Sequence, residues 1–119
     1  MATASRTAGT LTQLTATGNT GVIAVDTDLA LLCSIEHNNG TGTITAAATI
    51  QPQVSHDGTN WFDYGGAFTC DTTASSQQFF TFAVDLPLPG NDVRFSYTAP
   101  TGSTGHTLDV AFTRTTAIA

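Results

Sequence analysis

Lysine is absent from the sequence, and the basic total of Lys+Arg 3 stands against Asp+Glu 9, for a net charge of -6. Binding to nucleic-acid phosphates requires clustered basic side chains, and three scattered arginines cannot form such a cluster. Long apolar runs are also missing, since none approaches the ~20 residues that cross a bilayer as a helix. The sequence therefore argues against nucleic acid and membrane as partners.

Charged residues of either sign make up only 10% of the 119 residues, whereas soluble domains average about 25%. Disorder does not explain this scarcity, because disordered chains combine high charge with low hydrophobicity and this chain is 40% hydrophobic. A surface with few charges has few features that oppose association. We therefore expect part of the surface to be buried in an assembly.

Processing signals and cysteine motifs are both missing. The N-terminal segment carries one charge, Arg6, without the apolar stretch of a secretory signal, which predicts synthesis in a cytoplasm without export. Cys33 and Cys70 match no CxxC or zinc spacing. They can form one disulfide or remain two half-buried thiols, and a reducing cytoplasm favours the thiols.

Threonine, by contrast, accounts for about one residue in five, and it favours strands. Apolar residues alternate with polar ones in one segment after another, whereas helical periodicity is absent. The predicted strands cover residues 11–15, 22–25, 29–36, 43–55, 61–64, 79–84, 92–98 and 107–113. Seven to eight short strands predict an all-β fold, an antiparallel β-sandwich of the jelly-roll or immunoglobulin-like type. We expect this single domain at residues 11–119, after a flexible or partner-binding N-terminal arm at residues 1–10.

Two local features refine the predicted sheets. Asn39-Gly40, between the strands at 29–36 and 43–55, is a strong hairpin signal because these residue types accept positive φ. Pro52 falls on the apolar face of the strand at 43–55 and has no N–H to donate. It therefore predicts a sheet edge or a bulge at that point.

The most distinctive stretch is Ser55-His-Asp-Gly-Thr-Asn-Trp61. Asp57-Gly58 predicts a tight turn, since an aspartate side chain bonds to the backbone two residues on and glycine accepts positive φ. Trp61 then begins the returning strand, where its ring can cover one end of the sandwich. We assign Ser55, Asp57, Gly58 and Trp61 to turn and core structure.

The aromatic residues after this turn offer a binding alternative, in which Trp61, Phe62 and Tyr64 stack on a sugar. Alternation along a strand opposes one continuous platform, because Trp61 then points away from Phe62 and Tyr64. Arg94, inside a predicted strand, is either a solvent-facing partner of Asp92 or an interface anchor. Arg94, Phe62 and Tyr64 are therefore the candidate interface residues.

No pattern in the sequence indicates catalysis, a cofactor or a metal site. His37, His56 and His106 lie beside turns, share no ligand spacing, and are expected to be exposed. Cys33 lies in an apolar strand register, which is typical of an inert thiol. The Gly102-Ser-Thr-Gly105 loop lacks the strand-to-helix elbow of a nucleophilic serine. We predict a protein that is not an enzyme and binds no cofactor or metal.

The stretch Val54-Ser-His-Asp-Gly-Thr-Asn-Trp61 resembles the S-x-D-G-x-x-W signature of small tailed-phage structural proteins. The resemblance extends to Leu86-Pro-Leu-Pro89 ahead of Val93-Arg-Phe-Ser-Tyr97 and to a closing strand at 108–113, so it covers most of the chain. Such proteins are often head decoration (cement) or other minor virion proteins with a β-sandwich or jelly-roll fold. The family's pattern contains no catalytic residues.

The resemblance implies a capsid decoration protein, made in the host cytoplasm and bound to the major capsid protein on the outer surface of the virion, often as a homotrimer. A protein that binds only the assembled lattice and bridges its subunits stabilises that lattice by mass action. Two alternatives stay open. One is a glycan-binding module, because D-G-x-x-W turns also occur in carbohydrate-binding modules and adhesins, and the other is a tail or neck component of the virion.

Overall fold

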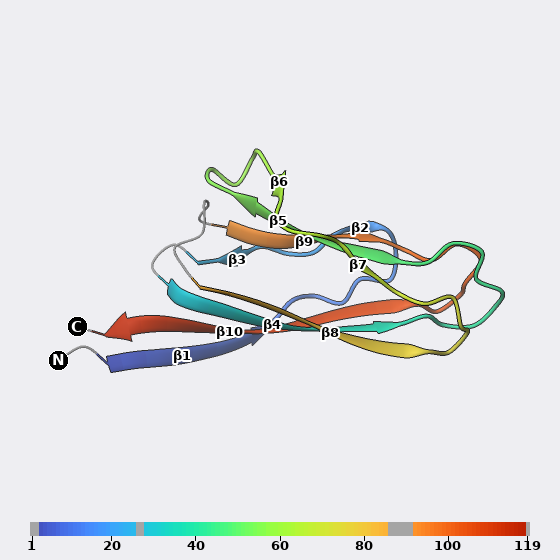
Figure 1. Cartoon of the computed structure of the whole chain (residues 1–119), viewed down its shortest axis with the longest axis horizontal. Helices are drawn as coiled ribbons and strands as arrows, with labels where there is room; N and C mark the ends of the chain where they lie inside the picture. The colour runs from blue at the N-terminus through green and yellow to red at the C-terminus, as the bar shows by residue number, and fades with distance from the viewer. Residues whose placement is uncertain (1–2, 26–27, 86–91, 119) are drawn as a thin grey trace.

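The computed structural model describes residues 3–25, 28–85 and 92–118. Its described residues form strands and no helix. The strands are β1 (Thr3–Thr10), β2 (Gly18–Asn19), β3 (Ile23–Ala24), β4 (Asp28–Asn38), β5 (Thr49–Ser55), β6 (Phe62–Asp63), β7 (Phe68–Thr69), β8 (Gln77–Asp85), β9 (Asp92–Thr98) and β10 (Thr107–Ile118). The molecule is elongated, 55 × 26 × 21 Å, with both chain ends at one end of the long axis (Figure 1).

Two antiparallel sheets stack on each other (Figure 1). Sheet A has the strand order β1-β10-β4-β8, and sheet B the order β2-β9-β5-β6, with β3 also paired to β9 and β7 to β5. Because β2 and β3 share the position beside β9, and β6 and β7 that beside β5, each sheet has four strand positions. Six of the nine connections between successive described strands pass from one sheet to the other. This topology confirms the predicted β-sandwich and is that of a double-sheet jelly roll rather than an immunoglobulin-like fold.

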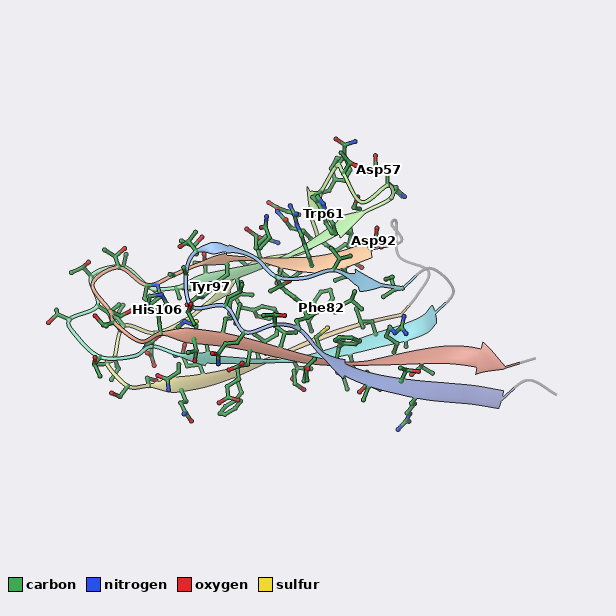
Figure 2. All side chains as sticks on the ribbon, turned by 180° about the vertical axis from the view of Figure 1, so that it is seen from behind. Asp57, Trp61, Phe82, Asp92, Tyr97 and His106 are labelled. Carbon is green, nitrogen blue, oxygen red and sulfur yellow. The ribbon has the colours of Figure 1, made fainter. Side chains whose placement is uncertain are left out.

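The core lies between the sheets, where the alternation expected from the sequence places every second side chain. On β9, Val93, Phe95 and Tyr97 are buried, and the residues between them are only partly covered. Figure 2 shows Phe82 between the two sheets. Its ring meets the Phe95 ring edge-on, with 5.6 Å between centroids. Each fully buried large apolar side chain contributes about 1.5–3 kcal/mol, so these residues hold the two layers together.

The hairpin predicted at Asn39-Gly40 is wrong, because β4 belongs to sheet A and β5 to sheet B. The turn itself forms: Gly40 has a φ of 70°, and its N–H donates to Asn38 Oδ1 at 2.9 Å. The chain then crosses between the layers, and the predicted strand at 43–55 is regular only from Thr49. A turn signal reports local backbone preference, whereas the pairing partner is chosen by packing across the whole domain.

Pro52 does not lie on an edge strand, since β5 has β9 on one side and β6 and β7 on the other. Its carbonyl accepts the Tyr64 N–H at 2.9 Å, so its backbone polar groups point to the side of β6 and β7. The ladder on that side is interrupted between those two short strands. Proline is tolerated here because no strand residue needs its missing N–H.

The N-terminal segment is part of the sandwich over most of its length. Residues Thr3–Thr10 form β1, which pairs with β10 from Thr3↔Ile118 to Thr10↔Ala111. The next predicted strand, at 11–15, is reduced to a bridge between Leu14 and Leu108. Residues 3–10 therefore do not form a separate arm, and a partner for this segment stays a prediction. The segment at 86–89 lies outside the described residues.

Candidate functional site

The loop at residues 55–61 is folded around one carboxylate. Asp57 Oδ1 accepts the Thr59 N–H at 2.9 Å and the Asn60 N–H at 2.8 Å, and Oδ2 accepts Asn60 Nδ2 at 2.9 Å. The Ser55 hydroxyl donates to Asp57 Oδ1 at 3.1 Å and accepts the Gly58 N–H at 2.9 Å. Gly58 has a φ of 76°, a conformation that glycine adopts without strain. Serine, aspartate and glycine each hold the turn.

These hydrogen bonds have an electrostatic consequence. The Asn60 and Thr59 backbone N–H groups hold the pKa of Asp57 well below its usual range, because they stabilise the ionised carboxylate. The side chain is exposed and stays charged at neutral pH. A carboxylate whose two oxygens accept hydrogen bonds from its own loop is a poor general acid. The geometry of the turn therefore indicates a structural role for Asp57.

Arg94 lies across the Trp61 ring. Its guanidinium carbon is 4.1 Å from the ring centroid, and its Nε donates to Gln53 Oε1 at 2.9 Å. The pairing with Asp92 is therefore not the one formed. Asp92 lies beside the turn, with Oδ2 3.4 Å from where a Cβ at Gly58 would be (Figure 2). Gln53 is directly opposite Arg94 on the neighbouring strand, and this cross-strand contact replaces the same-strand one.

The three aromatic residues after the turn point in different directions. Tyr64 packs against the core and meets Phe82 edge-on, with 6.1 Å between ring centroids. Trp61 has Arg94 on one face, and Phe62 is 58% exposed. They form no continuous stacking platform. A shallow hollow of about 370 Å³ beside the turn is lined by His56, Asp57, Asn60, Trp61 and Phe62.

A second surface was not anticipated from the sequence. The outward side chains of sheet A form what we call the A face: Ala8, Thr10, Leu32, Ser34, Phe79, Thr81, Ala83, Ala111 and Thr113. Leu32 and Phe79 are 47% and 70% exposed, and three shallow hollows of about 390, 270 and 320 Å³ lie along the face. Figure 1 shows no described segment covering it. The signal was present in the sequence, because the outward positions carry alanine, threonine and two large apolar residues in place of charges.

Among the side chains that the structure describes, charged ones occur on the A face only toward its two ends. Arg6 lies across from Thr115 at one end of the sheet. Glu36 and Asp109 are paired in register near the other end. Gln13 Nε2 donates to both Asp109 carboxylate oxygens, at 3.0 and 3.1 Å. The middle of the face is therefore uncharged and its ends are polar.

The histidines were expected to be exposed, and for His37 this is wrong, because it is fully buried. It continues the inward register of Cys33 and Ile35 on β4, a signal that the turn beside it obscured. Its Nε2 is 2.7 Å from the Tyr97 hydroxyl. Burial lowers the pKa of His37, and the nearby His106 lowers it further. His106 is half-buried, with Nδ1 2.8 Å from the Ser103 hydroxyl, and His56 is exposed.

The two cysteines are free and buried. Burial raises the pKa of the Cys33 thiol to about 12. It also raises the pKa of the Cys70 thiol to about 11, with a smaller contribution from the neighbouring Asp71. Neither thiol has the lowered pKa of a reactive cysteine, so both belong to the core.

Residues 3–25, 28–85 and 92–118 contain no group of three or more His, Cys, Asp or Glu side chains placed to bind a metal ion. Nor do they contain a helix with the length and apolar character needed to cross a membrane.

No known family model matches the chain, and no curated protein matches its sequence. Among solved structures, the fold is similar to the SPBc2 prophage-derived protein YomS, with a TM-score of 0.56 and 12% identity over 96% of both chains. A structure described as "CBM4 structure and function" gives a TM-score of 0.48 and 18% identity over 76% of this chain and 54% of that one. At these identities the likeness concerns the fold.

Proposed function

We propose that the chain is a non-enzymatic structural protein of a tailed-phage particle, which binds the assembled capsid through the A face and stabilises it as a decoration protein. Three observations support this proposal. The chain carries the S-x-D-G-x-x-W signature at Ser55–Trp61. Its fold is similar over almost its whole length to that of a prophage-derived protein. The A face, which no described segment covers, is uncharged in its middle and exposes Leu32 and Phe79.

The A face carries the proposal. Protein interfaces have a core depleted of charge and enriched in aromatic side chains, surrounded by a polar rim. Here Leu32 lies in the uncharged middle, and Arg6, Glu36 and Asp109 lie toward the ends. The exposed Phe79 lies directly opposite Glu36, at the border between the middle and one end. Covering the exposed apolar area of such a face contributes about 25 cal/mol per Å². The low overall charge of the chain is then explained by a surface that a partner covers in the assembled particle.

Capsid stabilisation follows from binding preference. The protein binds only the assembled lattice, so its binding lowers the free energy of the assembled shell and leaves that of the dissociated subunits unchanged. If one copy contacts two neighbouring capsid subunits, it also links them, and the effective concentration of each subunit near the other rises.

Purified protein mixed with expanded, undecorated heads of the encoding phage tests this proposal. We expect saturable, stoichiometric binding and a higher melting temperature of the heads. Ala111→Lys places a charge in the middle of the A face and should abolish binding. Thr98→Lys, an exposed position at the end of β9 in sheet B, is the matched control and should bind normally. Heads that stay bare, or equal binding by both variants, would contradict the proposal.

The hollow beside Trp61 favours a second candidate function, a glycan-binding module. Trp61 and Phe62 offer aromatic surface there, and His56, Asp57 and Asn60 offer polar groups. Sugars bind to such combinations of ring faces and hydrogen-bonding groups. Trp61 is the only tryptophan, so a titration with host surface polysaccharide reads out directly in its emission. Saturable quenching that Phe62→Ala abolishes would support this function.

A position in the tail or neck is the remaining alternative, and the A face serves a contact with a tail protein equally well. Electron microscopy of virions labelled with antibodies against this chain separates the cases. Label over the whole head surface supports decoration, and label confined to the tail or neck contradicts it.

A further inference from the structure

The four sheet edges of the sandwich are not alike. In sheet B, one edge consists of β2 and β3 and the other of β6 and β7, and each of these strands is two residues long. Very short edge strands are one of the ways in which proteins prevent unwanted strand pairing. In sheet A the edges are the eight-residue β1 and the nine-residue β8. The long edges therefore both lie in sheet A.

The β8 edge has few of the usual protections, because its one charged residue, Asp85, is the last of the strand. From Gln77 to Val84 it contains no charged residue and no proline. Its register with β4 runs without a bulge from Asn38↔Gln77 to Ala30↔Asp85. Among the described residues, β4 is the only strand that pairs with β8. The backbone N–H and C=O groups on its free side are thus a regular template for another strand.

The β1 edge differs, because Arg6 lies near its middle and is exposed. A second copy of β1 paired there across a two-fold axis would bring the two arginines close together, and like charges on facing strands are destabilising. Pairing β8 of one copy with β1 of the next leaves a free edge at each end of the assembly. Such a head-to-tail assembly adds further copies until a ring closes. Self-pairing of β8 has neither problem.

We propose that β8 pairs antiparallel with β8 of a second copy across a two-fold axis at Thr81, joining the two A sheets into one sheet of eight strands. In this register Phe79, which is 70% exposed, lies opposite Ala83 of the second copy, so a large side chain meets a small one. Phe80 lies opposite Phe82, which adds an aromatic cross-strand pair on the inner face. No charge within Gln77–Val84 faces another.

The pairing has a structural consequence on each side of the new sheet. On the inner side, Phe80 already stacks on Phe68 with 5.1 Å between ring centroids, so the aromatic row continues into the second copy. On the outer side, the two A faces become one continuous surface. The pairing forms in the free protein and does not depend on the proposed capsid function.

The mass of the free protein tests the pairing. In sedimentation equilibrium over a concentration series, we expect the mass to approach twice the 12.3 kDa of one chain. Thr81→Lys places like charges on the two-fold axis and should leave a monomer, because Thr81 is exposed and its replacement spares the core. Ala111→Lys, level with Thr81 but on the interior strand β10, is the matched control and should remain a dimer. A monomer at all concentrations, a trimer, or a dimer that survives T81K would overturn the pairing.

Mixing separates edge pairing from a general loss of folding. The T81K and T81E proteins, each monomeric alone, should form a heterodimer when mixed, because opposite charges then meet at the axis. Hydrogen exchange of the unaltered protein gives a second measurement. The β8 amides on the free side should become protected as concentration rises, whereas the β1 amides should not. Protection of β1 in place of β8 would assign the contact to the other edge.

Discussion

The hydroxyl of Tyr97 on β9 and Nε2 of His37 on β4 lie 2.7 Å apart, so one hydrogen bond joins the two sheets inside the core. The rings are 5.5 Å apart between centroids, and the side chains are 1% and 0% exposed. His37 Nδ1 and Asn39 Oδ1 are also buried, without a hydrogen-bond partner among the described residues. Polar groups at this depth stay bonded or destabilise the fold, which makes this pair sensitive to substitution.

Tyr97→Phe should reduce the free energy of unfolding by about 1–3 kcal/mol, because it leaves His37 Nε2 buried without its partner. Urea denaturation measures the change. Tyr64→Phe, at the margin of the core, is the matched control and should lose less. Equal losses for the two variants would show that the link between the sheets contributes no more than a peripheral hydroxyl.

Stability should fall on mild acidification because of His37. Burial lowers its pKa below the ordinary value of 6.5, His106 lowers it further, and Asn39 and Asp71 oppose the shift. The unfolded chain therefore binds a proton at this histidine more readily than the folded chain does. The stability that the fold has with a neutral, buried His37 is therefore complete above pH 6.5. It is lost as the pH falls below that value, because the unfolded chain then takes up the proton first.

Melting temperatures measured between about pH 7.5 and about pH 5 check this prediction. His37→Gln removes the titrating group and should flatten the profile, even if the variant is less stable throughout. The exposed His56 supplies the control, since His56→Gln should keep the original slope. An unchanged slope in H37Q would assign the acid sensitivity to another group.

The turn at residues 55–61 should depend on Asp57 more than on other exposed carboxylates. Asp57→Asn keeps one oxygen for the two backbone N–H groups, but it removes the negative charge and replaces Oδ2, the acceptor of Asn60 Nδ2, with a donor. It should therefore lower the melting temperature at neutral pH. Because the pKa of Asp57 is lowered, its contribution is present above pH 3.8 and is lost as the pH falls below that value. Asp63→Asn, whose carboxylate accepts one bond from Gln53, should have a smaller effect. The reverse order would contradict the role of Asp57.

Arg94→Ala should change the emission of Trp61, because it uncovers the ring face on which the guanidinium lies. The accompanying loss of stability should be about 0.5–1 kcal/mol, as for cation–π contacts near the surface. Fluorescence spectra of the folded proteins report the first effect and urea titrations the second. Arg6→Ala removes an equal charge far from Trp61 and should leave the spectrum unchanged.

Cys33 and Cys70 should not react with a thiol reagent in the folded protein at mildly alkaline pH. Both are buried, and burial raises the pKa of each thiol, to about 12 and about 11. Two thiols per chain should become reactive on unfolding in denaturant. Fewer than two under those conditions would show that the cysteines pair, and fast reaction of the folded chain would contradict their burial.

The strands could be predicted from the sequence because alternation is a local signal, and β4, β8, β9 and β10 each follow it. The pairing of strands could not. The turn at Asn39-Gly40 forms as expected, but β5 joins the other sheet, which depends on contacts between residues far apart in the chain. The burial of His37 could not be predicted for a related reason: its neighbours in sequence indicate a turn, whereas it is buried against Tyr97, which is distant in sequence. The residues of the A face occupy the outward positions of the same alternating strands, so the sequence contains them but does not show that they form one surface.

The central place of β10 sets an order on the assembly of the chain. This strand, Thr107–Ile118, lies between β1 and β4 and pairs with both. During synthesis, β1 has no partner in sheet A until β10 has emerged, and before then β4 can pair only with β8. The two layers cannot close around a finished core before that moment. Folding is therefore a late event governed by contacts of long sequence separation, a topology that folds slowly compared with helical domains.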